Sequence, residues 1–196
     1  MSSTSAQPSK HLMHFEGGNA LSAFRAQALL PRLQAVNARI TGVSARHVHW
    51  VWSDAALDEA VQAKLAALLT YGEPYAAPQG EAELVVVMPR LGTVSPWASK
   101  ATDIAHNCGL GNAAVHRVER VTEFRLQLKS GLLDAFKSNK GLGKTLSEGE
   151  LQACALLLHD RMTESVAWER EAARHLFDEQ PAEPLAHVDV LGAGRP

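Results

Sequence analysis

The sequence has little net charge and no long apolar run. Nineteen lysines and arginines against 21 aspartates and glutamates leave a formal charge of −2 over 196 residues. Without an excess of positive charge, a protein surface gains little from nucleic-acid phosphates or from anionic lipids, so we expect neither as a partner. The apolar run Leu84 to Met88 is far too short to span a bilayer, so no membrane partner is expected either.

Cysteines are also scarce, and the first residues carry no apolar core. Cys108 and Cys154 are the only two cysteines, too few for a disulfide framework, and both can pack as small apolar side chains. Residues 1–10 are polar and lack the apolar stretch of a signal peptide. We therefore expect a cytoplasmic protein with a mobile tail over residues 1–10.

Apolar spacing predicts two strand–helix–strand units, over about residues 11–52 and 83–128. In the first unit, Asn19 is the expected N-cap of a helix that ends or kinks near Leu30, because Pro31 follows. A second helix is expected after Asp54 as its N-cap, with leucines repeating up to Leu69.

The second unit begins with the strand Leu84 to Met88, whose apolar residues are typical of burial on both faces. Ser95 followed by Pro96 starts a helix that Gly109 ends. The strand 115–128 mixes polar and apolar residues and is predicted to be half exposed.

These elements predict an α+β fold. Neither unit has enough strands to bury its own helix, so we expect the two to share one mainly antiparallel sheet with helices on one face. Ser147 and Glu150 form a capping box that begins a long C-terminal helix, predicted to run until Pro181. Residues 11–180 would form one domain, and residues 181–196 would begin another.

Two histidines on the first unit's last strand have the spacing of metal ligands. His47 and His49 would need a third ligand from elsewhere, such as His116 or Asp54. Two histidines on the exposed face of a strand are the commoner case, but a metal-dependent hydrolase using His47, His49 and His116 stays an alternative. Cys108 is a poor nucleophile candidate, because His106, two residues away on a helix, points to a different side.

The polar face of the helix after Ser95 is the other candidate site. It is either a solvated face, or a docking face or anion site, since a helix N-terminus presents free N–H groups to an anion. The candidate residues on and beside this helix are Arg90, Ser95, Trp97, Ser99, Lys100, Thr102, Asp103, His106 and Asn107.

The segment PRLGTVSPWASKATDIAHNCGL, residues 89–110, closely resembles the N-terminal region of one enzyme family. That family is the large, single-chain bacterial phosphoribosylformylglycinamidine synthase, also called formylglycinamide ribonucleotide amidotransferase. Further matches follow in the family's order: LSAFR from Leu21, YG from Tyr71, PQG from Pro78, LHDRM from Leu158 and VDVLG from Val188.

This resemblance implies a domain like a fused dimer of the small stand-alone synthase subunit. The family continues with a helical linker, a synthetase domain that uses ATP and Mg²⁺, and a glutaminase domain that supplies ammonia for purine biosynthesis. Their active sites would lie outside this chain, so the resemblance implies a segment without catalytic residues, metal or cofactor of its own. It would pack the synthetase domain against the glutaminase domain, which favours docking for the helix after Ser95.

Two features depart from the family pattern. Pro31 stands where relatives continue a helix, and residues Ser130 to Lys144 are similar to an insertion. A free-standing dimerisation module remains a further alternative, and the fragment can be expected to self-associate through faces that its neighbours would otherwise cover.

Overall fold

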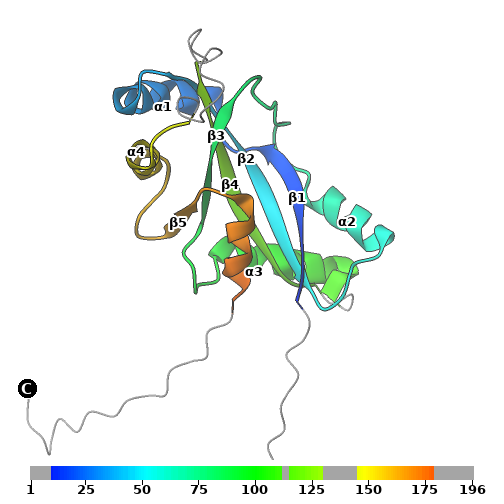
Figure 1. The fold of residues 1–196 in the computed structure, drawn as a ribbon. Helices are drawn as coiled ribbons and strands as arrows, with labels where there is room; N and C mark the ends of the chain where they lie inside the picture. The colour runs from blue at the N-terminus through cyan, green and yellow to red at the C-terminus, as the bar shows by residue number, and fades with distance from the viewer. Residues whose placement is uncertain (1–9, 112–114, 130–144, 179–196) are drawn as a thin grey trace, which may run out of the picture.

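The computed structural model describes residues 10–111, 115–129 and 145–178, which form one five-stranded sheet with helices packed against it (Figure 1). All but the last residue of the predicted tail over residues 1–10, the insertion at 130–144 and the linker start at 181–196 lie outside the described residues. In chain order the elements are β1 (His11–Asn19), α1 (Ala23–Val36), β2 (Ile40–Ser53), α2 (Glu59–Leu69), β3 (Ala82–Pro89), α3 (Pro96–Ala105), η1 (His106–Leu110), β4 (Val115–Leu128), α4 (Glu148–Leu158), β5 (Glu164–Ala167) and η3 (Arg170–Phe177).

The sheet confirms the two predicted strand–helix–strand units and their antiparallel pairing. Its strand order is β1-β2-β4-β3-β5, and every neighbouring pair is antiparallel. The second strands of the two units, β2 and β4, pair at the centre along their whole length, from Ile40 opposite Leu128 to Ser53 opposite Val115. Each first strand, β1 or β3, lies outside its own partner, and β5 is added beyond β3.

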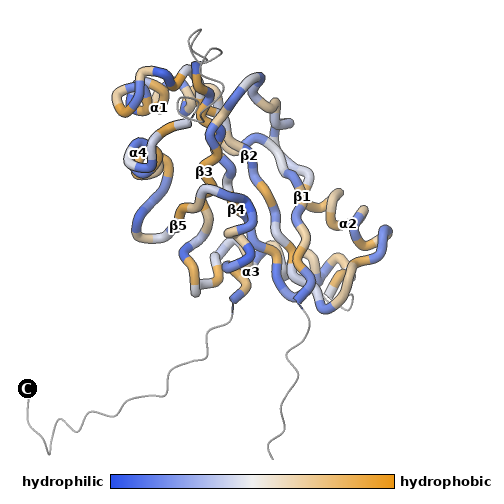
Figure 2. The backbone as a smooth tube through the Cα atoms, in the orientation of Figure 1, coloured by the Kyte–Doolittle hydropathy of each residue, from blue (hydrophilic) through white to orange (hydrophobic). Residues whose placement is uncertain are grey.

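Helices α1 to α4 cover one face of this sheet, as the sequence predicts. Val43 and Ala45 of β2 pack with α1 and α4 at one end of that face, whereas Val51 packs with α2 and α3 at the other end. The alternate residues Trp50 and Trp52 lie on the opposite face, in a cluster with η3. Much of the interior strand β3 is apolar in Figure 2, and its residues 85–88 are buried.

The prediction of one long C-terminal helix is wrong. Helix α4 ends at Leu158, and the chain then turns into β5 and the short helix η3. At this turn, the N–H of Asp160 donates to the Glu164 carboxylate at 2.8 Å, and the Asp160 carbonyl accepts the N–H of Glu164. The apolar residues that suggested one helix are divided among three elements: Cys154 in α4, Val166 in β5 and Phe177 in η3.

Strand β4 is also more buried than its composition predicts. Glu119 and Glu123 have no exposed area at all, although a carboxylate at either position suggested a half-exposed strand. Each is paired: Glu119 with Arg117, and Glu123 with Arg46 and Arg170. A carboxylate can be buried where an oppositely charged side chain pairs with it. The pattern of residues along one strand does not show whether such a partner is present.

Two of the predicted helix caps are wrong, and two are confirmed. Ser22 rather than Asn19 caps α1, and Asp58 rather than Asp54 caps α2. Ser95 caps α3, and Ser147 forms the predicted capping box with Glu150.

Pro31 does not end α1. The helix continues through it to Val36, so of the predicted end or kink near Leu30, the end is wrong. The side chain of Pro31 is exposed, so its ring lies outside the core and the helix loses only one internal N–H donor there.

A close backbone approach at Gly18 gives a first testable prediction. A Cβ atom there would lie 2.6 Å from the carbonyl oxygens of both Tyr71 and Glu73, whose backbone cannot move aside easily. We expect Gly18→Ala to lower the free energy of unfolding by about 1.5 kcal/mol through overpacking.

Gly149→Ala in α4 is the matched control, because among the described residues no atom outside its own helix backbone lies within 4 Å of its Cβ position. That variant should be neutral or slightly stabilising, since alanine favours a helix over glycine. Urea denaturation of both variants tests this, and equal stabilities would contradict the crowding at Gly18.

Among the described residues, no helix is both long enough and apolar enough to cross a membrane.

Candidate functional site

Part of the predicted polar face of α3 contacts the protein's own sheet. The Ser95 hydroxyl accepts the N–H of Ala98 and donates to Oε2 of the buried Glu119, each at 3.0 Å. Thr102 Oγ1 accepts the N–H of Val118 at 3.0 Å, and His106 Nε2 donates to the Val115 carbonyl at 2.7 Å. Ser95, Thr102 and His106 therefore hold α3 on β4. The anionic group next to the Ser95 hydroxyl is the protein's own Glu119 carboxylate.

The remaining predicted residues lie on the outside of this region. Trp97 is half-buried, and the others are exposed: Arg90, Ser99, Lys100, Asp103 and Asn107. These side chains are available to a partner.

The double role of Ser95 can be tested against a simpler cap. The Ser22 hydroxyl only accepts the N–H of Arg25, whereas the Ser95 hydroxyl also donates to buried Glu119. We expect Ser22→Ala to cost about 0.5 kcal/mol and Ser95→Ala about 1.5 kcal/mol of unfolding free energy, because the second change also leaves a buried carboxylate oxygen short of a donor. If thermal or urea unfolding shows the same loss of stability in both variants, the hydrogen bond from Ser95 to Glu119 does not stabilise the fold.

The two histidines of β2 lie on the helix-covered face and not on an exposed one. His49 is fully buried, its Nε2 lies 2.8 Å from the Tyr71 hydroxyl, and its ring centroid lies 5.5 Å from that of Trp97. The Arg120 guanidinium lies 4.7 Å from the Trp97 ring and donates to the Tyr71 hydroxyl at 3.2 Å. His47 is half-buried beside them, so the expectation of two exposed histidines is wrong.

Burial keeps both imidazoles neutral at pH 7. Burial, reinforced by the charge of Arg120, lowers the pKa of His47 to about 4. Burial, reinforced by His47 and Arg120, also lowers the pKa of His49 to about 4.

The structure does not assemble the metal site of the hydrolase alternative. His116 stacks on Trp52, with ring centroids 4.9 Å apart, and pairs with Asp54. Trp52 belongs to the cluster under η3, on the face of the sheet opposite His47 and His49. Within the described residues, no group of three or more histidine, cysteine or acidic side chains is placed to hold a metal ion. The metal-hydrolase hypothesis therefore has no geometric support.

The structure buries one cysteine and leaves the other partly exposed. Cys154 is buried in α4, as expected, and burial together with Glu150 raises the pKa of its thiol. Cys108 is only partly buried, in the turn η1 after α3, and its carbonyl accepts the Lys64 ammonium. A raised thiol pKa disfavours the reactive thiolate at Cys154.

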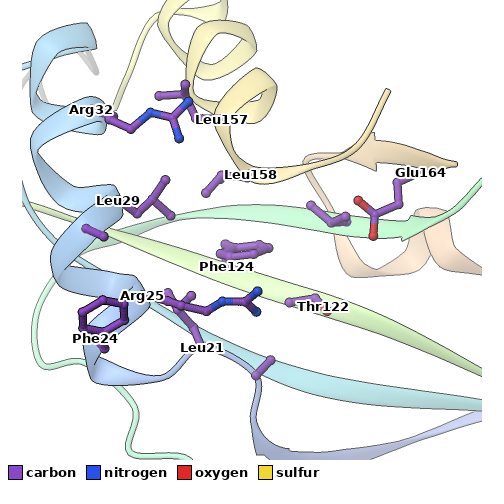
Figure 3. A pocket seen from close by; sticks show the side chains of 13 residues that line it. Leu21, Phe24, Arg25, Leu29, Arg32, Thr122, Phe124, Leu157, Leu158 and Glu164 are labelled. Atoms are coloured by element: carbon purple, nitrogen blue, oxygen red, sulfur yellow. The ribbon is translucent and has the colours of Figure 1, made fainter. Parts of the chain in front are cut away.

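In the part of the chain that the structure describes, the helix-covered face is hollowed near α1 and α4 and again near α2 and α3. The first, called here the α1/α4 hollow, has a volume of about 480 Å³ and lies between α1, α4 and the sheet (Figure 3). Val87, Thr122 and Phe124 belong to its sheet side. Its other lining residues are Ala20, Leu21, Phe24, Arg25, Ala28, Leu29, Arg32, Leu157, Leu158 and Glu164.

The second hollow is a smaller apolar cleft of about 200 Å³ between α2 and α3. It is lined by Leu65, Leu68, Leu69, Tyr71, Trp97, Lys100, Ala101, Ile104, Ala105 and Val118. Two of the predicted site residues, Trp97 and Lys100, thus line this cleft.

Sequence reasoning missed the α1/α4 hollow. The only local signal was Arg25 and Arg32, seven residues apart and therefore on one side of a helix. That signal was hidden, because the predicted break at Pro31 removed Arg32 from the helix. Both hollows offer apolar surface for binding.

A family model described as "Formylglycinamide ribonucleotide amidotransferase N-terminal" matches residues 46–177. The match extends from the middle of β2 to the end of η3 and covers more than half of the chain. It includes the whole segment 89–110 that carries the sequence resemblance, together with α3 and its polar residues. The chain therefore belongs to the family of formylglycinamide ribonucleotide amidotransferase N-terminal domains, as the sequence resemblance predicted.

Proposed function

We propose that this chain is the N-terminal scaffold of a cytoplasmic phosphoribosylformylglycinamidine synthase. It would take no part in the chemistry and would pack the synthetase domain against the glutaminase domain of the same full-length chain. The reaction of that enzyme converts formylglycinamide ribonucleotide to the amidine, with ATP, Mg²⁺ and ammonia from glutamine. Rigid packing between the two active sites would prevent the ammonia from escaping to solvent.

The observation that carries this proposal is the apolar surface left uncovered on the helices. Phe24 of α1 is 80% exposed, Ile104 of α3 is 56% exposed and Leu156 of α4 is 55% exposed. Phe24 and Ile104 line the two hollows on the helix-covered face. Large apolar side chains beside a concave surface are typical of a face that another protein surface covers.

The chemistry of the polar residues agrees with a non-catalytic role. In the described residues, the buried carboxylates Glu119 and Glu123 are paired with arginines. His49 is buried against Tyr71 and Trp97, and half-buried His47 lies beside Tyr71. These groups hold elements of the domain together. ATP and Mg²⁺ would be bound by the synthetase domain.

We further propose that the domain is a fused dimer of one small β-α-β-α unit. The first unit would be β1-α1-β2-α2 and the second β3-α3-β4-α4. Pairing of β2 with β4 at the centre, and of β1 and β3 on the outer sides, is the order expected when two such units join through their second strands. Strand β5 and η3 would be additions to this pair.

The purified chain tests the non-catalytic role directly. We expect it to release no glutamate from glutamine and to hydrolyse no ATP in the presence of formylglycinamide ribonucleotide, with the full-length enzyme as positive control. Turnover by the chain alone would refute the proposal.

The packing role is tested in the full-length enzyme. Phe24→Lys together with Ile104→Lys should lower the amidine formed per glutamine hydrolysed at least tenfold, because a buried unpaired charge costs several kcal/mol. Glu169→Lys, an exposed change beside η3, is the control and should leave the ratio unchanged. An unchanged ratio in the double variant would contradict docking on the helix-covered face.

A further inference from the structure

The α1/α4 hollow contains two arginines that form no ion pair with any residue that the structure describes. Arg25 and Arg32 lie on α1, and in Figure 3 both guanidinium groups point into the hollow. Within the described residues, neither side chain has a hydrogen-bond or ion-pair partner. Glu164 lines the far side, but its Oε2 accepts the N–H of Asp160 at 2.8 Å and it forms no ion pair with either arginine.

The rest of the lining is mostly apolar. Leu21 and Leu29 from the α1 side, Leu157 and Leu158 from α4 and Phe124 from β4 surround the two guanidinium groups. Phe24 lines the same hollow with most of its surface exposed. Arginines in an apolar surround are typical anchors of protein–protein interfaces, where a carboxylate binds both N–H groups of a guanidinium.

Resting on the proposed function, we propose that the α1/α4 hollow is the docking site for an acidic segment of the synthetase–glutaminase part of the same full-length chain. That segment carries two carboxylates about 10 Å apart, matching the seven-residue spacing of Arg25 and Arg32 along α1. Between them it carries an apolar side chain that packs toward Phe124. Two unpaired cations favour an acidic occupant, and the exposed Phe24 favours an occupant with apolar surface of its own.

A small anion fits these observations less well. Both arginines are exposed, and no polar side chain of the hollow is fully buried, so nothing encloses a small ligand. A small-molecule site normally buries most of its ligand. A protein segment, in contrast, supplies the cover that the open hollow lacks.

Zero-length cross-linking in the full-length enzyme identifies the occupant. In an Arg25→Lys/Arg32→Lys variant, a water-soluble carbodiimide joins each substituted amine to a carboxylate only where the two form an ion pair. We expect cross-links from positions 25 and 32 to acidic residues of the same chain beyond residue 196. The Arg174→Lys variant, changed on η3 at an exposed site on the opposite face, is the control and should give none to the same segment.

Charge reversal tests the energetics independently. In the full-length enzyme, Arg25→Glu/Arg32→Glu should speed hydrogen exchange at the amides of residues 157–164 at least tenfold, and 0.5 M salt should speed it in the unchanged enzyme. Arg174→Glu should leave this exchange unchanged. Circular dichroism and thermal unfolding of the isolated chain should not change in either variant, because none of these side chains has a hydrogen-bond or ion-pair partner among the described residues.

The outcomes separate this inference from the proposed function. If the helices are protected in the full-length enzyme but positions 25 and 32 cross-link to nothing, or only to Glu164, the inference is wrong and the packing role stands. The inference is also wrong if the cross-links form only between two copies of the chain, which would make a second copy the occupant. It is likewise wrong if millimolar phosphate or ATP abolishes the cross-links, which would make a small anion the occupant. If the helices exchange equally fast in the full-length enzyme and in the isolated chain, both proposals are wrong.

Discussion

Glu123→Ala is expected to lower the free energy of unfolding by about 3 kcal/mol, the typical cost of breaking a buried ion pair from one side. The Glu123 carboxylate is fully buried in β4 and binds Arg46 from β2 and Arg170 from η3. Burial alone would raise the pKa of the Glu123 carboxyl, but the hydrogen bonds from both arginines outweigh it and lower that pKa. Removing the carboxylate leaves two largely buried guanidinium groups and detaches η3 from the sheet.

Glu169→Ala is the matched control, because Glu169 is an exposed acid one residue before Arg170. It should change the stability by less than about 0.5 kcal/mol. Glu123→Gln should fall between the two, since it keeps the shape and one acceptor but loses the charge. Urea unfolding of the three variants measures the differences, and equal stabilities of Glu123→Ala and Glu169→Ala would contradict a structural role for this ion-pair network.

The same residues show what the sequence could and could not predict. The strand 115–128 was predicted with its bounds, because alternating Val and polar residues fit a pleated strand. Its burial was missed, because the arginines that neutralise Glu123 come from positions 77 residues before it and 47 residues after it. Pairing over such distances follows from the fold and not from local pattern.

Helix N-caps could be predicted from the sequence where one suitable residue precedes the helix, as at Ser95 and Ser147. The prediction failed where two candidate caps lie four residues apart, as at Asp54 and Asp58. The candidate site followed the same rule. The polar residues of α3 were found, but the sequence did not show that Ser95, Thr102 and His106 are used against β4. The α1/α4 hollow forms only where α1, α4 and the sheet meet, so the sequence alone does not show it.

Acidification from pH 7 to pH 5 is expected to destabilise the domain through His47 and His49. Both pKa values are lowered from 6.5 to about 4 in the folded protein, so between those pH values the unfolded chain binds protons that the folded one does not. Stability therefore falls as the pH falls from about 6.5, and the loss is complete near pH 4. At pH 5 we expect the unfolding free energy to be lower than at pH 7 by about 2 kcal/mol because of fully buried His49. The contribution of half-exposed His47 should be smaller.

The slope of stability against pH is the quantity to measure, because the pH 5–7 window lies above the range where carboxylates titrate. Urea unfolding should be measured at steps of half a pH unit. The unfolding free energy of the unchanged chain should fall with pH, whereas that of His47→Gln/His49→Gln should stay nearly constant, whatever its value at pH 7. His11→Gln, which removes an exposed histidine at the start of β1, should keep the original slope. A double variant that keeps that slope would show that these two imidazoles are already protonated in the folded domain. The packing of Tyr71 and Trp97 around a neutral His49 would then have to be wrong.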